Sequence, residues 1–142
     1  FYNFTEKFSQ RMSQYDYKKL GITDDEIELI EKKLDSILEK GFQNVMIHGD
    51  AVFSNVISLP NNQLKFVDVR GFENGVKTCF GHPLYDYAKI YQSLVGYDEI
   101  LLDKKMKVSY KTNMIKHFES NFSEQEINHI DQVIKIRTEY FP

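Results

Sequence analysis

Residues 48–68 read HGDAVFSNVISLPNNQLKFVD and contain two short β-prone runs, at 56–59 and 64–67, separated by the turn sequence PNNQ. β-Prone runs on either side of a turn rich in proline and asparagine predict a β-hairpin. The open end of a hairpin brings together the residues that flank its two strands. We therefore expect Asn55 and Asp68 to lie side by side, next to the loop that carries Asp50.

These three residues, Asp50, Asn55 and Asp68, are the candidate functional residues of the segment. Two carboxylates and an amide oxygen suit a hard cation such as Mg²⁺, which prefers oxygen ligands and shares them with substrate phosphates. In phosphoryl transfer one carboxylate orients and deprotonates the attacking hydroxyl, while the other groups hold metal ions that bridge the phosphates. The alternative is that all three are turn and cap residues, because Asp and Asn readily bond their own backbone.

The flanking sequence is mainly helical in pattern. Helical periodicity predicts helices over residues 1–21, 24–40 and 108–122, and a further helix after Ser123. Capping boxes, in which Ser or Thr is followed three residues later by Glu, mark two of the helix starts, at Thr23 with Glu26 and at Ser123 with Glu126.

The region around the hairpin predicts one strand, one loop and one helix. Residues 44–47 are a short β-prone run, and residues 69–81 form a glycine-punctuated loop. A helix from Pro83 to Gly96 follows. Its buried face is expected to comprise Leu84, Tyr87, Ala88, Tyr91, Leu94 and Val95. The expected fold is a single α+β domain over residues 1–142, mainly α-helical, with a small central β-hairpin.

Composition excludes several classes of protein. Hydrophobic residues make up 42% and charged residues 27% of the 142 residues, as in globular domains. The net charge of −3, with both signs mixed along the chain, provides no surface for nucleic acid, and no apolar run is long enough to span a membrane. The single cysteine, Cys79, allows no internal disulfide, and His82, His117 and His129 lack metal-ligand spacing and are expected at the surface. We expect a cytoplasmic protein.

Two segments carry a resemblance to a known family. His48-Gly49-Asp50-Ala51-Val52-Phe53-Ser54-Asn55, followed by Phe66-Val67-Asp68-Val69-Arg70-Gly71, is similar to the catalytic loop and metal-binding segment of the aminoglycoside phosphotransferase and choline kinase family. These are small-molecule kinases with a protein-kinase-like fold. The resemblance implies that Asp50 is the catalytic base, that Asn55 and Asp68 bind Mg²⁺, and that His48 braces the loop.

The resemblance extends over about residues 44–96. Pro83-Leu84-Tyr85-Asp86-Tyr87-Ala88 resembles the segment in which the family's aspartate, here Asp86, anchors the catalytic loop from the start of a helix. Tyr85 and Tyr97 are further candidates for lining an acceptor pocket.

The chain departs from the family at two positions near the site. Relatives often carry histidine, and protein kinases lysine, two residues after the catalytic aspartate, where this chain has Val52. Arg70 resembles the residue found in kinase-like proteins associated with bacterial surface polysaccharides. It can contact a phosphate or carboxylate of the substrate, or make a structural ion pair.

A kinase also needs a lobe that covers the nucleotide phosphates, and this chain has no G-x-G-x-x-G motif. We therefore expect the carboxyl-terminal lobe of a kinase-like fold, without the amino-terminal nucleotide lobe and feeble or inactive by itself. The implied activity is transfer of the γ-phosphate of ATP or GTP, with Mg²⁺, to a hydroxyl of an aminoglycoside, amino alcohol or sugar. The alternatives are a non-catalytic kinase-like module that binds a nucleotide or partner protein, and a protein-directed kinase. The acceptor and the oligomeric state stay open.

Overall fold

The computed structural model describes residues 8–10, 12–14, 16–38, 45–73 and 76–140. The chain divides into two compact units, Phe1–Gln43 and Asn44–Pro142. The described residues form an α+β fold that is mainly helical and contains three two-stranded antiparallel sheets. In the described part of the chain, no helix has both the length and the apolar character needed to cross a membrane.

The first unit contains the 3₁₀ helix η1 (Tyr17–Leu20) and the helix α2 (Asp24–Leu38). Gly21 ends η1 with a φ of 80°, which glycine adopts without strain. The predicted capping box is confirmed: the Thr23 N–H donates to Glu26 Oε2 at 2.7 Å, and Glu26 N–H donates back to Thr23 Oγ1 at 3.3 Å. The last two residues predicted for this helix, 39 and 40, lie outside the described residues.

The prediction of one continuous helix over residues 1–21 is wrong. Helical residues 8–10 and 12 are followed by a turn at 13–14 before η1 begins, while residues 1–7, 11 and 15 lie outside the described residues. Ser13 Oγ donates to the Gln10 carbonyl at 2.7 Å. Such local side-chain bonds compete with helix continuation, and periodicity alone does not register them.

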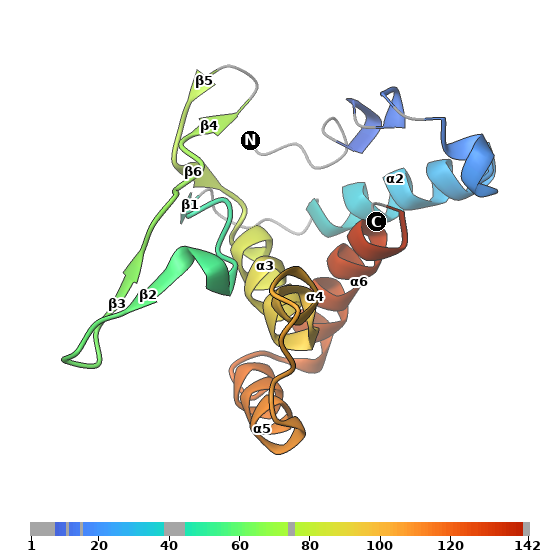
Figure 1. Cartoon of the computed structure of the whole chain (residues 1–142). Coiled ribbons are helices and arrows are strands. Elements are labelled where there is room, and N and C mark those ends of the chain that lie inside the picture. Colours follow the sequence, from blue (N-terminus) through green and yellow to red (C-terminus); the bar gives the residue numbers. More distant parts are fainter. Residues whose placement is uncertain (1–7, 11, 15, 39–44, 74–75, 141–142) are drawn as a thin grey trace. The chain divides into compact units, whose positions relative to one another are not determined.

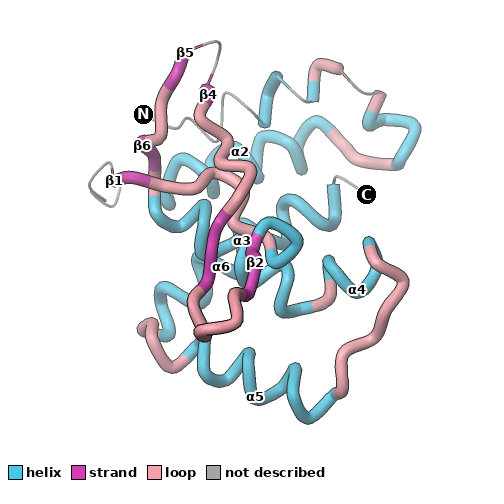
Figure 2. Tube along the Cα trace, turned by 60° about the vertical axis from the view of Figure 1, so that its left-hand side comes forward, coloured by secondary structure: helices cyan, strands magenta, loops and turns pink. Residues whose placement is uncertain are grey.

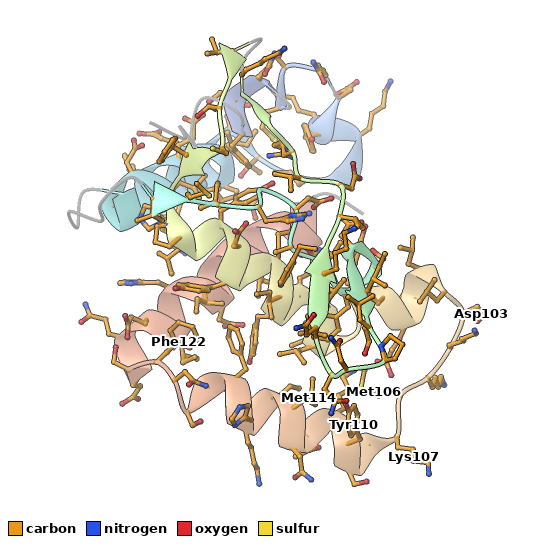
Figure 3. All side chains as sticks on the ribbon, turned by 90° about the vertical axis from the view of Figure 1, so that its left-hand side faces the viewer. Asp103, Met106, Lys107, Tyr110, Met114 and Phe122 are labelled. Carbon is orange, nitrogen blue, oxygen red and sulfur yellow. The ribbon has the colours of Figure 1, made fainter. Side chains whose placement is uncertain are left out.

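In the second unit, α3 (Pro83–Val95) is in contact with the other three helices, α4 (Tyr97–Leu101), α5 (Val108–Glu119) and α6 (Glu124–Tyr140) (Figure 1). Leu84, Leu94 and Ile130 are almost fully buried in this core. Aromatic rings join α3 to α5 and the residues after it: Tyr87 meets Phe122 edge-on at 4.9 Å between ring centroids. Figure 3 shows Phe122 just beyond one end of α5, with Tyr110 near the other end.

The strands are short and lie beside long connecting loops (Figure 2). β2 (Val56–Ser58) and β3 (Leu64–Phe66) form the predicted hairpin, with Val56 opposite Phe66 and Ser58 opposite Leu64. In its loop the Asn62 N–H donates to the Leu59 carbonyl at 3.1 Å and Asn62 has a φ of 59°. This is the pattern of a type I turn followed by a bulge residue in the left-handed region.

The prediction that residues 69–81 form only a loop is wrong. The segment contains β4 (Phe72–Glu73), its partner β5 (Val76–Lys77), and β6 (Phe80–Gly81), which pairs with β1 (Val45–Met46). The sequence pair Asn-Gly at 74–75, between two β-prone pairs, is a hairpin signal that could have revealed β4 and β5. Pairing of β1 with β6 joins residues far apart in sequence and has no such local signal.

Helix α3 runs from Pro83, at its first position, to the cap at Gly96, as predicted. Its buried face is rotated from the predicted one, because Tyr87 and Val95 are exposed. The buried residues of the helix are Leu84, Tyr85, Ala88, Lys89, Gln92, Ser93 and Leu94. The face turned inward is therefore partly polar, and two of its polar side chains, Lys89 and Ser93, contact the loop described next.

Candidate active site

The loop between β1 and β2 is anchored at its start by Asp86, in the first turn of α3. The His48 and Gly49 N–H groups donate to the two carboxylate oxygens of Asp86, at 2.6 and 2.9 Å. Bonds to an ionised acceptor are stronger than those between neutral groups. One carboxylate thus fixes two successive peptide groups directly before Asp50.

His48 joins this loop to the end of β3. Its Nδ1 accepts from the Asp50 N–H at 3.3 Å, so the proton of the neutral ring belongs on Nε2, which lies 2.9 Å from the Val67 carbonyl and donates to it. The His48 carbonyl also accepts from the Arg70 N–H at 3.0 Å. These contacts tie the loop to the segment that carries Asp68.

Gly49 is required by both conformation and space. Its φ is 78°, and a Cβ at this position would lie 2.8 Å from the Cβ of Arg70. Residues with a Cβ atom rarely adopt this backbone conformation, and the space between Gly49 and Arg70 is too small for a methyl group. The close approach of the two chain segments therefore depends on glycine.

The Asp50 side chain is held at both carboxylate oxygens. Lys89 Nζ lies 2.5 Å from Oδ1, and Asn55 Nδ2 lies 3.3 Å from Oδ2. Asn55 Nδ2 also donates to the Asp50 carbonyl at 2.9 Å. With the amide nitrogen of Asn55 used in these bonds, Oδ1 is its atom suited to ligate a cation.

Lys89 is the charged partner that the sequence analysis missed. Its side chain is only 7% exposed, against 35% for Asp50. The loop itself contributes no positive charge two residues after Asp50, because that residue is Val52, which is apolar and 5% exposed. A lysine three residues after Asp86 on a helix lies on the same helix face, and this spacing is the signal that could have identified it.

Ser93 completes a polar stripe on α3. Its Oγ accepts from the Phe53 N–H at 3.1 Å, at the start of the 3₁₀ helix η2 (Phe53–Asn55). Asp86, Lys89 and Ser93 are spaced i, i+3 and i+7, so they share one face of α3. Three side chains of α3 thus hold the loop: one at the start of the loop, one at the Asp50 carboxylate, and one near the end of the loop.

Asp68 follows the hairpin at the position predicted. The Val67 N–H donates to the Asn55 carbonyl at 3.0 Å, which continues the β2–β3 pairing to the residues that flank the strands. Asp68 is exposed and has a φ of 59°. Among the described residues, no hydrogen bond or ion pair engages its carboxylate, which is therefore open to a ligand from solvent.

The oxygen atoms present fit a Mg²⁺ ion that is shared with a substrate. Among the described residues, no three His, Cys, Asp or Glu side chains group closely enough to hold a metal by themselves. Asn55 and Asp68 provide one amide and one carboxylate oxygen, and Mg²⁺ commonly takes one or two protein carboxylates plus substrate phosphates. This donor set fits a metal that arrives with a phosphate ligand rather than a closed protein site.

The remaining predicted residues occupy different environments. Arg70 Nη1 donates to the Tyr85 hydroxyl at 3.1 Å, and its guanidinium carbon lies 5.3 Å from the centroid of the Tyr85 ring. Tyr85 is only 6% exposed, so it supports Arg70 from the core rather than lining an open surface. Tyr97 is 40% exposed on α4, and no described contact joins it to the loop.

The expectation that His82 is a surface residue is wrong. His82 is buried at the N-cap of α3, where its Nδ1 accepts from the Leu84 N–H at 3.1 Å. Burial lowers the pKa of His82 below its ordinary value, because the charged form is desolvated. His82 thus caps, in its neutral form, the helix that carries the polar stripe.

No protein-family model, no curated protein and no solved structure matches this chain.

Proposed function

We propose that this chain is the catalytic lobe of a small-molecule kinase of the aminoglycoside phosphotransferase and choline kinase type. The observation that carries the proposal is the contact of Asn55 with both the side chain and the backbone of Asp50, together with the backbone bond from Val67, the residue before Asp68, to the Asn55 carbonyl. A base and oxygen ligands for Mg²⁺ are among the groups that a protein contributes to phosphoryl transfer. The reaction is transfer of the γ-phosphate of ATP or GTP to a hydroxyl of an aminoglycoside, amino alcohol or sugar in the cytoplasm.

Four residues act in this reaction, as base, metal ligands and phosphate contact. Asp50 orients the acceptor hydroxyl and receives its proton as the acceptor oxygen forms a bond to the γ-phosphorus. The bond between the γ-phosphorus and the bridging oxygen breaks, and the nucleoside diphosphate leaves with that oxygen. Asn55 Oδ1 and the Asp68 carboxylate would hold Mg²⁺, which when bound neutralises charge on the phosphates. Arg70 is a candidate contact to a phosphate.

The proposal includes a second lobe that covers the nucleotide, since the sequence has no glycine-rich phosphate loop. Phosphoryl transfer is therefore to be measured in the complete polypeptide that carries these residues. Labelled ATP and GTP are offered with Mg²⁺ and a panel of aminoglycosides, amino alcohols and sugars.

The decisive variants are Asp50→Asn and Asp68→Asn. Loss of the base or of the metal ligand should reduce transfer by about 10²-fold or more. Asp103→Asn is a matched control for Asp68→Asn, because Asp103 is also exposed and has a positive φ, of 49°. We expect this control to keep wild-type transfer.

Transfer that survives both substitutions would refute the proposed roles. Nucleotide binding by the folded wild type, without transfer to any acceptor, would favour the non-catalytic kinase-like module. A phosphorylated peptide product would favour a protein-directed kinase.

A further inference from the structure

The Lys89 ammonium group contacts the candidate base, Asp50, from helix α3. Lys89 lies in the second turn of α3, between Asp86 and Ser93, which both bond to the backbone of the loop. The three side chains share one helix face. The distance between Lys89 Nζ and Asp50 Oδ1 is therefore set by the same helix that sets the path of the loop.

The ion pair is not explained by a general gain in stability. Desolvation of two charges offsets much of their attraction, and buried pairs can often be replaced by apolar residues without loss. Lys89 is almost fully buried on α3, four residues after the buried Tyr85 and therefore on the same helix face, where an apolar side chain would also fit the pattern. The buried charge of Lys89 is therefore best explained by its contact with Asp50.

The two oxygens of Asp50 are held differently. Oδ1 has the short 2.5 Å contact to Lys89, and Oδ2 has the longer 3.3 Å contact to Asn55. A carboxylate bound firmly at one oxygen has its rotation about the side chain restricted. Since Lys89 is buried and Asp50 is one-third exposed, the charge contact is on the protein side of the carboxylate.

We propose that Lys89 is the positioning residue of Asp50: it binds Oδ1 and thereby fixes the side-chain rotamer in which Oδ2 meets the acceptor hydroxyl. In this arrangement Lys89 supplies from α3 the positive charge that Val52 does not supply from the loop. The effect of Lys89 on turnover rests on the proposed function. The effect of Lys89 on the Asp50 rotamer does not depend on that function.

The kinetic test compares Lys89→Met, which removes the charge and keeps the length, with Lys89→Arg, which keeps the charge. In Lys89→Met we expect kcat to fall by about 10- to 100-fold through misplacement of the base. The KM for the acceptor should change by less than about threefold, because binding contacts are unaffected. Lys89→Arg should recover part of kcat, and Lys116→Met, at an exposed position of α5, should match the wild type.

The second test needs no activity. In the complete polypeptide with ¹³C,¹⁵N-labelled aspartate, three-bond couplings report the χ1 angle of Asp50. We expect one rotamer in the wild type and in Lys89→Arg, and averaging over rotamers in Lys89→Met.

The two tests separate the two proposals. A wild type that transfers no phosphate contradicts the proposed function, while the χ1 couplings still decide the role of Lys89. A single Asp50 rotamer in Lys89→Met, or an active Lys89→Met variant with unchanged kcat, overturns the positioning role.

Discussion

Asp50→Asn should destabilise the protein more than Lys89→Met, although both substitutions break the same ion pair. Asp50→Asn leaves Lys89, whose side chain is 7% exposed, without its charged partner. Lys89→Met instead leaves a carboxylate that is 35% exposed and can gain hydration. The asymmetry follows from which of the two charges water can reach.

The structure gives the expected magnitude. At the 2.5 Å separation of Lys89 and Asp50, the attraction is about 7 kcal/mol for an effective dielectric constant of about 20, before desolvation is subtracted. Removing one partner of a buried pair typically costs about 3–5 kcal/mol. Because Asp50 is partly exposed, we expect about 3 kcal/mol for Asp50→Asn and about 1 kcal/mol or less for Lys89→Met.

The assay is urea unfolding of four proteins: the wild type, the two single variants and the double variant. The double variant should be close in stability to Lys89→Met, since it carries no unpaired charge at the site. The coupling energy in the double-mutant cycle is then about 3 kcal/mol in magnitude, equal to the cost of Asp50→Asn. If Asp50→Asn costs no more than Lys89→Met, or if the two effects simply add, the reasoning from burial is wrong.

Three further predictions concern the loop and its helix. Gly49→Ala should destabilise the protein by about 1–3 kcal/mol more than Gly21→Ala in urea unfolding. Both glycines have a φ near 80°, but only the Cβ at Gly49 meets Arg70, whereas the one at Gly21 meets nothing within 4 Å; equal losses would contradict the close approach. Asp86→Asn should cost about 2 kcal/mol and speed hydrogen exchange of the two amides that the carboxylate accepts from, and unchanged exchange would exclude the anchor role. Because burial lowers the pKa of His82 in the folded state, the unfolded state binds more protons below its ordinary pKa of about 6.5. The free energy of unfolding should therefore fall as the pH drops from about 7 to 5, and His82→Asn, which keeps a cap acceptor, should reduce this slope; a slope unaffected by the substitution would assign it to other groups.

The hairpin and the helix starts were predictable because their signals are local. The turn at residues 60–63 specifies the connection, and the alignment of β2 with β3 then places the residues that flank them. The two capping boxes act within four residues of sequence, and both form. For these elements the physical cause is contained in the segment itself.

The inner face of α3 was not predictable in the same way. Apolar periodicity assigned Tyr87 and Val95 to the core, yet Lys89 and Ser93 are buried instead. What makes a buried lysine acceptable is a carboxylate 39 residues earlier in the chain, and the partner of Ser93 is a backbone N–H at Phe53. Such partners are known only once the loop has been placed against the helix.

The polar stripe of α3 also determines how the loop can open. Asp86, Lys89 and Ser93 hold the loop at successive points along one helix, so releasing a single contact leaves the other two in place. Full opening of the loop requires all three to be lost together, which places the loop and α3 in one cooperative folding unit. Slow, concerted opening of this unit, rather than local flickering of single residues, is then the motion that would expose the Asp50 carboxylate fully.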